Sequence, residues 1–380
     1  MRGKYAIVGV GESDAGRRLG RSAMALHIEA ATRAMSDAGL TPADIDGLLT
    51  RPNRSEPQFN YSAALCGQLG ITPSYFTDIA LGGASSAAMI LNAVAALDAG
   101  LATAVLCVNG DAQTTRRHNR RARLTNWLED FERTYGLIGA PETYALGAAR
   151  HMYEYGTTSA DFGAIAVACR KHASLNPNAT FRTPITLEEH QESRYIAEPF
   201  HLLDCCPVTD AAGALIVTSA ERAAHLAQKP VYILGVGQGF THSDLPWADP
   251  MTTGAMKQAS DRAYAMAGLQ PQDVDLAELY DCFTYVVLLT LEDYGFCEKG
   301  EGGAFVRDGR IELGGELPVN TGGGLLSQGH ASGSLLITEA GIQLRGQAGA
   351  RQVAGAKTAI VSGQCGATGI NVCLLLGNAT

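Results

Sequence analysis

One pattern of residues occurs twice in this chain, and it limits the folds that the chain can adopt. Residues 6–11 read Ala-Ile-Val-Gly-Val-Gly and residues 232–237 read Tyr-Ile-Leu-Gly-Val-Gly. An Ala-rich stretch follows each run and leads into similar segments at 38–46 and 267–275, where Ala-Gly-Leu precedes a Pro and two Asp residues. Short apolar runs that alternate with amphipathic helices indicate βαβ units. The repeat predicts an α/β fold of two duplicated halves, and the alternative is two unrelated α/β units with similar loops.

Each repeat also carries the signals that end a helix. We expect helices at 22–38 and 257–267, each followed by a glycine, Gly39 or Gly268, that suits the left-handed conformation found at many helix ends. A proline comes next because it cannot continue the helix, and an Asp caps the element that leads into an apolar strand.

The two halves differ in length. We place them at residues 1–230 and 231–380, with the additional length of the first half at about 110–205. Long insertions in compact folds usually carry function, so we expect a lid or loop subdomain there. The last two strands are predicted at 358–362 and 371–376, around a Gly-rich turn.

Composition excludes several classes of protein. The 380 residues are 46% hydrophobic and 18% charged, with a formal net charge of −9, which argues against a nucleic-acid-binding protein. The apolar run near the N-terminus is too short for a secretory signal, and the longest apolar stretch, 87–108, contains Asn92 and Asp98 and is not expected to span a membrane. Nine cysteines without a CxxC pair indicate a reducing cytoplasm, and we expect no structural metal.

Four Gly-rich segments adjoin the predicted strand ends. They lie at 81–87, 278–284, 320–333 and 363–369. The glycines of the repeated motif at 9–11 and 235–239 do not complete a dinucleotide-binding fingerprint, and the chain has no P-loop or nucleophile-elbow motif. Small residues at a turn into a helix let a ligand approach backbone N–H groups, as an oxyanion or a thioester carbonyl would require. For any one of these segments taken singly, close helix–strand packing is the more common explanation.

Taken in order, these segments resemble the thiolase superfamily, specifically the sterol-carrier-type or lipid-transfer-protein-type thiolases. The duplicated halves, the stretch at 203–210, the run Asp-Cys-Phe-Thr at 281–284 and the GHxxG motif at 329–333 carry this resemblance, which covers nearly the whole chain. It implies a five-layered α/β/α/β/α thiolase fold, a homodimer, and a loop domain over a site for a coenzyme A thioester. Coenzyme A would be part of the substrate, and no other cofactor is implied.

Two departures from that family bear on the chemistry. Leu81 stands where a thiolase carries its acyl-accepting cysteine, and a leucine cannot become a thiolate. Tyr280 stands where these relatives usually carry a His before Asp-Cys-Phe-Thr. The steroid side-chain aldolases of the lipid-transfer type share both departures. The resemblance therefore implies retro-aldol cleavage of a bulky 3-hydroxyacyl-CoA, such as a steroid side-chain intermediate, to a ketone or aldehyde and a short acyl-CoA.

The resemblance also suggests which residues act. Tyr280 is expected to be the base or the relay for the hydroxyl proton, activated by a positive neighbour for which His330 is the candidate. His330 would serve the oxyanion or proton transfer, and Cys365 would protonate the enolate. Each has a structural alternative: a hydrogen-bonded core tyrosine, a structural imidazole or a buried thiol.

Five further residues are predicted to contact the substrate. They are the leucine at the former nucleophile position, an Asp that could instead be a cap, and three loop glycines: Leu81, Gly82, Asp281, Gly324 and Gly366. The basic run at 116–123 could meet the phosphates of coenzyme A or a partner, or could be a solvated face.

Partners and alternative functions complete the expectations. Relatives of this kind often work with a small acyl-CoA-binding protein that contains an OB-fold and a zinc ribbon. The alternatives to an aldolase are a thiolase or acyltransferase that uses another cysteine, such as Cys282 or Cys365, and a non-catalytic acyl-CoA-binding subunit.

Overall fold

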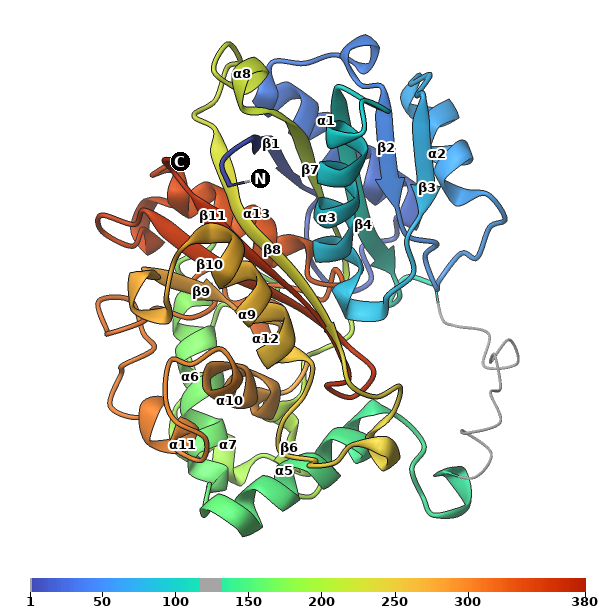
Figure 1. Ribbon diagram of the computed structural model, residues 1–380. Helices are drawn as coiled ribbons and strands as arrows, with labels where there is room; N and C mark the ends of the chain where they lie inside the picture. The colour runs from blue at the N-terminus through green and yellow to red at the C-terminus, as the bar shows by residue number, and fades with distance from the viewer. Residues whose placement is uncertain (1, 117–131) are drawn as a thin grey trace.

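The chain folds around one mixed nine-stranded sheet (Figure 1), in a computed structural model that describes residues 2–116 and 132–380. The strand order is β3-β2-β4-β7-β1-β8-β11-β10-β9, and β5 and β6 form a separate two-stranded sheet. The strands are β1 (Tyr5–Glu12), β2 (Gly47–Thr50), β3 (Tyr75–Asp78), β4 (Ala104–Ala112), β5 (Tyr195–Ala197), β6 (Phe200–His201), β7 (Asp210–Ser219), β8 (Val231–Phe240), β9 (Leu276–Glu278), β10 (Thr358–Cys365) and β11 (Ile370–Gly377).

The strand arrangement repeats in the two halves of the chain. In the first half, β2 is parallel to β4, β4 is antiparallel to β7, and β7 is antiparallel to β1. In the second half, β9 is parallel to β10, β10 is antiparallel to β11, and β11 is antiparallel to β8. Among residues 2–116 and 132–380, the two sets of strands are joined only by the pairing of β1 with β8, over two residues each. The predicted fold of two duplicated halves is confirmed, whereas the boundary between residues 230 and 231 stays a prediction.

Helices lie between the two sets of strands and outside each of them. The α-helices are α1 (Ala23–Ala38), α2 (Tyr61–Leu69), α3 (Ser85–Asp98), α5 (Ala140–Tyr155), α6 (Ser159–Ser174), α7 (Leu187–Glu192), α8 (Ala220–Ala223), α9 (Met256–Ala267), α10 (Thr284–Asp293), α11 (Gly302–Phe305), α12 (Gly324–Ser327) and α13 (Ser334–Leu344). Both α3 and α13 contact strands of the two halves, while α1 packs on β1, β4 and β7 and α9 packs on β8 and β11. This gives the five layers of the α/β/α/β/α arrangement.

The glycines of the repeated strand motif serve helix packing. A side chain at Gly11 would collide with the Ala30 carbonyl of α1, and a side chain at Gly237 would collide with the Ala259 carbonyl of α9. The motif is therefore a requirement of close helix–strand contact and not of phosphate binding.

The predicted helix ends are also observed. The α1 helix starts after Ser22, whose side chain accepts from the Ala25 amide, and ends at Gly39 with φ 70°. The α9 helix ends at Gly268 with φ 63°. Both glycines adopt the left-handed conformation that the sequence indicates. The strands β10 and β11 run longer than predicted because their ladder continues to the pair between Cys365 and Ile370.

The extra length of the first half lies between β4 and β7, where it forms α5, α6, α7 and the β5–β6 pair. In Figure 1 these helices (green) lie beside α10, α11 and α12, and α6 contacts all three. Of the basic run at 116–123, only Arg116 is described, and it pairs with Glu56 at 2.9 Å. The rest of that run, for which we expected a phosphate, a partner or solvent, lies outside the described residues.

Candidate active site

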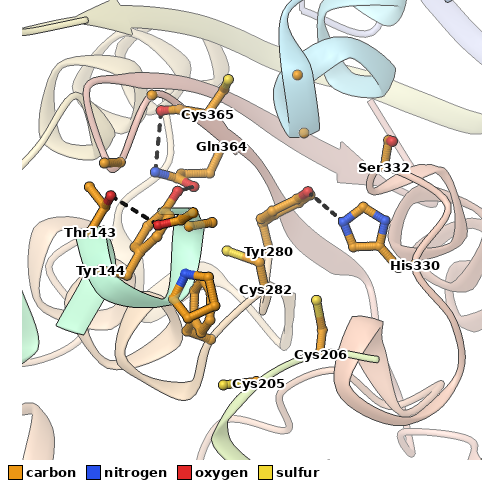
Figure 2. A pocket seen from close by; sticks show the side chains of 18 of the residues that line it. Thr143, Tyr144, Cys205, Cys206, Tyr280, Cys282, His330, Ser332, Gln364 and Cys365 are labelled. Carbon is orange, nitrogen blue, oxygen red and sulfur yellow. Dashed lines mark hydrogen bonds between the residues drawn. The ribbon is translucent and has the colours of Figure 1, made fainter. Parts of the chain in front are cut away.

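A cavity of about 560 Å³ lies where the carboxyl ends of parallel strands from both halves converge. Ligand sites in open α/β sheets usually lie at such strand ends. Residues that follow β2, β4, β9 and β10 line it, together with the loop before α13 and part of the inserted segment (Figure 2). These include Arg51, Gln113, Tyr280, Gln364, Cys365, His330 and Ser332.

Tyr280 is held in this cavity by its backbone and by two glycines. Its amide donates to the Ser362 hydroxyl at 2.8 Å. A side chain at Gly83 would collide with the Tyr280 hydroxyl, and a Cβ at Gly333 would lie 3.3 Å from the ring. Tyr280 is 5% exposed, so its ring is fixed and only its hydroxyl edge can serve a ligand.

His330 faces that hydroxyl from the loop between α12 and α13. Its Nε2 lies 3.3 Å from the Tyr280 hydroxyl oxygen, and its amide donates to the Thr209 hydroxyl at 2.7 Å. Figure 2 shows the phenol and the imidazole directed toward each other. The structure thus brings together two residues that lie fifty positions apart in sequence.

The protein environment moves the two pKa values apart. Burial raises the pKa of the Tyr280 phenol well above its ordinary value, and Arg51 opposes that rise. Desolvation lowers the pKa of the His330 imidazole to about 4. At neutral pH the imidazole is therefore uncharged and can accept a proton, but it does not supply the positive charge that we expected beside Tyr280.

Cys365 ends β10 on another wall of the cavity. A side chain at Gly82 would collide with its sulfur, so the glycine allows the thiol to approach the start of α3. Gly366 follows in the left-handed conformation with φ 61° and also lines the cavity. The predicted residues Tyr280, His330, Cys365, Gly82 and Gly366 thus surround one space.

Three arginines that the sequence did not single out line the cavity: Arg51, Arg54 and Arg133. Arg51 follows β2 directly, is half-buried, and donates from Nη1 to the Ser332 hydroxyl at 2.6 Å. The sequence feature that could have pointed to Arg51 as a site residue is its position directly after a buried strand, because ligand sites in α/β folds lie at the carboxyl ends of parallel strands.

Comparisons with known proteins agree with this geometry. A profile described as thiolase C-terminal domain-like matches residues 237–378. A 17-hydroxy-3-oxo-4-pregnene-20-carboxyl-CoA lyase from Mycobacterium tuberculosis is 40% identical over 96% of this chain and 97% of its own length. A steroid side-chain-cleaving aldolase from Thermomonospora curvata is 39% identical over 91% of both chains. The chain belongs to the thiolase superfamily.

Solved structures place it further within that superfamily. An Ltp2–ChsH2(DUF35) aldolase superposes with a TM-score of 0.91 at 36% identity, covering 99% of this chain and 98% of that one. A human mitochondrial 3-ketoacyl-CoA thiolase at 17% identity shares the fold, with a TM-score of 0.72 over 99% of each chain. The predicted membership among the sterol-carrier-type thiolase-like aldolases is confirmed.

Leu81 occupies the position at which a thiolase would carry its nucleophile. It caps the short helix η2 (Gly82–Ala84), and its amide donates to the Ser85 hydroxyl at 2.9 Å. Its side chain packs against the hydrophobic core and is not among the described residues that line the cavity. The predicted contact between Leu81 and the substrate is therefore replaced by core packing, and Gly82 and Gly83 form the wall there.

Asp281 and Gly324 lie behind the cavity rather than in it. The Asp281 carboxylate accepts from the amides of Leu325 at 2.8 Å and Leu326 at 3.2 Å. A side chain at Gly324 would collide with that carboxylate. Asp281 thus acts as a helix cap, one of the two roles that the sequence left open. Neither Asp281 nor Gly324 is among the described residues that line the cavity.

Other thiols line the cavity but are poor nucleophiles. Burial raises the pKa of Cys282 and of Cys206, and raises that of Cys205 to about 12. Because the thiolate is the reactive form, these sulfurs are inert at neutral pH. Among residues 2–116 and 132–380, no three His, Cys, Asp or Glu side chains are placed to hold a metal ion, and no helix is both long and apolar enough to cross a membrane.

Proposed function

We propose that this chain catalyses the retro-aldol cleavage of a bulky 3-hydroxyacyl-CoA, such as a steroid side-chain thioester, to a ketone or aldehyde and a short acyl-CoA. The observation that carries the proposal is the contact of Tyr280 with His330, 3.3 Å apart, in a cavity whose former nucleophile position is Leu81. The names of the two relatives at about 40% identity agree with the predicted carbon–carbon lyase.

The first step moves a proton from the substrate along this pair. The 3-hydroxyl gives its proton to the Tyr280 oxygen while the Tyr280 proton passes to Nε2 of His330, so no free tyrosinate is required. Both pKa shifts oppose this transfer, because a raised pKa makes the Tyr280 phenol a weaker acid and a lowered pKa makes the His330 imidazole a weaker base. The relay therefore requires the two proton transfers to occur together with carbon–carbon cleavage, and the enolate charge to be stabilised. Tyr280 is then the relay and His330 is the terminal base, which divides the roles that the sequence left open.

Loss of that proton breaks the Cα–Cβ bond. The electrons of the O–H bond form the carbonyl of the leaving ketone, and the electrons of the Cα–Cβ bond form the enolate of the remaining thioester. A proton then adds to Cα and completes the short acyl-CoA. Cys365, which lines the same cavity as Tyr280 and His330, is the thiol that we propose as the donor.

The cavity walls suit an apolar acyl group. Leu137, Ile138, Pro141, Val208 and Phe283 line it on the side of the inserted segment. Ile138 and Val208 are more than half exposed, at 60% and 54%, although large apolar side chains usually avoid water. A fused-ring substrate would cover both, since burying apolar surface is favourable.

A thiolase or acyltransferase reaction is the second candidate, and the thiols argue against it. Burial raises the pKa of Cys282, so it is a weak nucleophile. Cys365 has the better position, and an acyl group on its sulfur would be the evidence for that alternative. The third candidate, a non-catalytic acyl-CoA-binding subunit, would not need the contact between Tyr280 and His330.

Two partners belong to this proposal. A solved structure that superposes with a TM-score of 0.91 is named as an Ltp2–ChsH2(DUF35) aldolase. We infer that this chain too works with a small acyl-CoA-binding protein that contains an OB-fold and a zinc ribbon. For the homodimer, β3 is an edge strand of the sheet and Phe76 on it is 49% exposed. An edge strand with an exposed aromatic residue suits pairing with a second copy.

Product analysis tests the function. The protein is incubated with a panel of 3-hydroxyacyl-CoA thioesters with small or fused-ring β-substituents, alone and with the small partner protein, without added coenzyme A. Chromatography with mass spectrometry should find a ketone and a shortened acyl-CoA in equal amounts, preferentially from the bulky substrates. Turnover that requires free coenzyme A would contradict the proposal, as would the absence of any cleavage in the complex.

A further inference from the structure

Arg51 and Tyr280 stand at equivalent positions in the two halves of the molecule. Arg51 lies twelve residues after Gly39, and Tyr280 lies twelve residues after Gly268. Each follows the short strand that comes after a capped 3₁₀ turn, β2 in the first half and β9 in the second. The duplication thus delivers one cation and one phenol to the same cavity from its two halves.

Arg51 is held in place by a chain of buried hydrogen bonds. Its partner Ser332 has a backbone φ of 49°, a conformation that is costly for a residue other than glycine. Ser86 on α3 donates to the Ser332 carbonyl at 2.8 Å, and Asn109 on β4 donates to the Ser86 hydroxyl at 2.9 Å. The position of the guanidinium is therefore fixed before a ligand arrives.

The charge of Arg51 is not neutralised by a carboxylate. Within residues 2–116 and 132–380, no Asp or Glu lies within ion-pair distance of Arg51, and its one hydrogen bond goes to a neutral hydroxyl. A guanidinium has five N–H donors and stays protonated, so the remaining donors are available to an anion in the cavity. By contrast, Arg345 and Arg351 are paired with Asp37 and Glu339.

We propose that Arg51 is a catalytic residue that donates to the thioester oxygen and stabilises the negative charge of the enolate. This inference rests on the proposed retro-aldol reaction and adds a residue to it. The Tyr280–His330 pair removes the hydroxyl proton, and the electrons released by carbon–carbon cleavage move onto the thioester oxygen. A fixed cation at that oxygen lowers the barrier because it is already oriented before the charge develops.

The charged and titratable groups around Arg51 are consistent with this role. Tyr280, Cys365 and His330 are titratable neighbours that line the same cavity. The described acidic side chains that line it are Glu132 and Asp244, and Arg133 is a further basic one. Arg54 also lines it, and Asp111 faces that loop, where its carboxylate accepts from the amides of Arg54 at 2.9 Å and Ser55 at 3.2 Å. The Ala112 amide also donates to Asp111 at 2.9 Å, so this carboxylate is held by three backbone amides and not by Arg51.

The test compares Arg51→Gln and Arg51→Lys with the control Arg170→Gln, in complex with the partner protein where that is required for activity. Arg170 also donates to a serine hydroxyl, Ser327 at 2.9 Å, but lies outside the cavity. We expect Arg51→Gln to lower kcat by about 10²- to 10³-fold, as removal of one oxyanion donor does, with KM changed less than about threefold. Arg51→Lys should recover part of the loss because it keeps the charge, and Arg170→Gln should keep the wild-type kcat.

A second readout separates charge stabilisation from proton removal. In D₂O the wild-type protein should exchange the Cα hydrogens of the short acyl-CoA product, a reaction that forms the enolate without the 3-hydroxyl. Arg51→Gln should lose this exchange, whereas Tyr280→Phe should retain it. If wild-type protein neither cleaves nor exchanges, the proposed function fails. If wild-type protein cleaves and Arg51→Gln keeps its kcat, or changes only KM, the role of Arg51 is overturned.

Discussion

The Tyr280 hydroxyl lies 3.3 Å from Nε2 of His330, and the cavity moves their pKa values in opposite directions. The pair is therefore neutral throughout the physiological range, with the phenol as donor and the imidazole as acceptor. When a proton passes along this pair, the phenol is reprotonated by the substrate hydroxyl and the imidazole becomes a cation, whose charge is balanced by the enolate. In the proposed reaction, this pair takes the place of the thiolate that a thiolase would use.

Removal of the Tyr280 hydroxyl should abolish most of the activity. Tyr280→Phe keeps the ring packed between Gly83 and Gly333 but breaks the relay, so kcat should fall by about 10²- to 10⁴-fold, the usual contribution of general acid–base catalysis. Steady-state kinetics measure this, and the affinity for the thioester and the melting temperature should stay close to wild type.

The matched control for this variant is Tyr294→Phe. Tyr294 is also a buried tyrosine, and its hydroxyl donates to Asn371 at 2.9 Å away from the cavity. Its loss should cost about 1 kcal/mol of unfolding free energy and leave kcat unchanged. An equal loss of kcat in both variants would show that Tyr280 acts only through the fold.

The pH dependence of kcat/KM should report the lowered pKa of His330. Because the imidazole must be neutral to accept the proton, activity falls as the pH drops through the pKa of about 4. We expect a flat profile from about pH 5 to pH 9, whereas an ordinary imidazole would give an acidic limb near 6.5. Initial rates of protein shown to be folded at each pH provide the measurement, and an acidic limb near 6.5 would contradict this role.

Cys365 should matter for protonation of the enolate and not for covalent capture. Cys365→Ala removes the proposed proton donor, and kcat should fall by about 10²-fold. Intact-protein mass spectrometry of the wild type during turnover should find no acyl adduct on this sulfur. Full activity in Cys365→Ala would instead assign the thiol to the cavity wall alone.

Asp281 should affect stability in a pH-dependent way. Burial raises the pKa of Asp281 to about 7 in the folded protein, above the value of about 3.8 expected in the unfolded chain. The protonated side chain therefore favours the folded state at low pH, and this contribution to the free energy of unfolding is lost as the pH rises from about 4 to about 7. Asp281→Asn removes one acceptor for the Leu326 amide, at a cost of about 1 kcal/mol. Urea unfolding should therefore find a larger deficit at pH 5 than at pH 8, and a deficit that grows with pH would contradict this.

The sequence predicted the duplication because its signals are local. Gly39 and Gly268 must adopt left-handed conformations, and the strand glycines must admit a helix, so both leave a visible pattern. The meeting of Tyr280, His330 and Cys365 came from the family resemblance and from their places at strand ends. These features agree with the observed cavity.

Other parts of the site could not be predicted in the same way. Adjacent residues of an extended chain point to opposite sides, so Asp281 faces α12 while its neighbour Tyr280 faces the cavity. Arg51 left no motif, since a single arginine after a strand is common. Its significance depends on Ser332, which lies 281 positions away, and only the folded chain brings the two together.

One measurement tests the central claim most directly. The complex is incubated in D₂O with a bulky 3-hydroxyacyl-CoA and no free coenzyme A, and products and intact protein are analysed together. Retro-aldol cleavage predicts equal amounts of ketone and short acyl-CoA, at least one deuterium at Cα of that acyl-CoA, and a protein of unchanged mass. An acyl group attached to any cysteine, or product that forms only after coenzyme A is added, would contradict cleavage without a nucleophilic thiol.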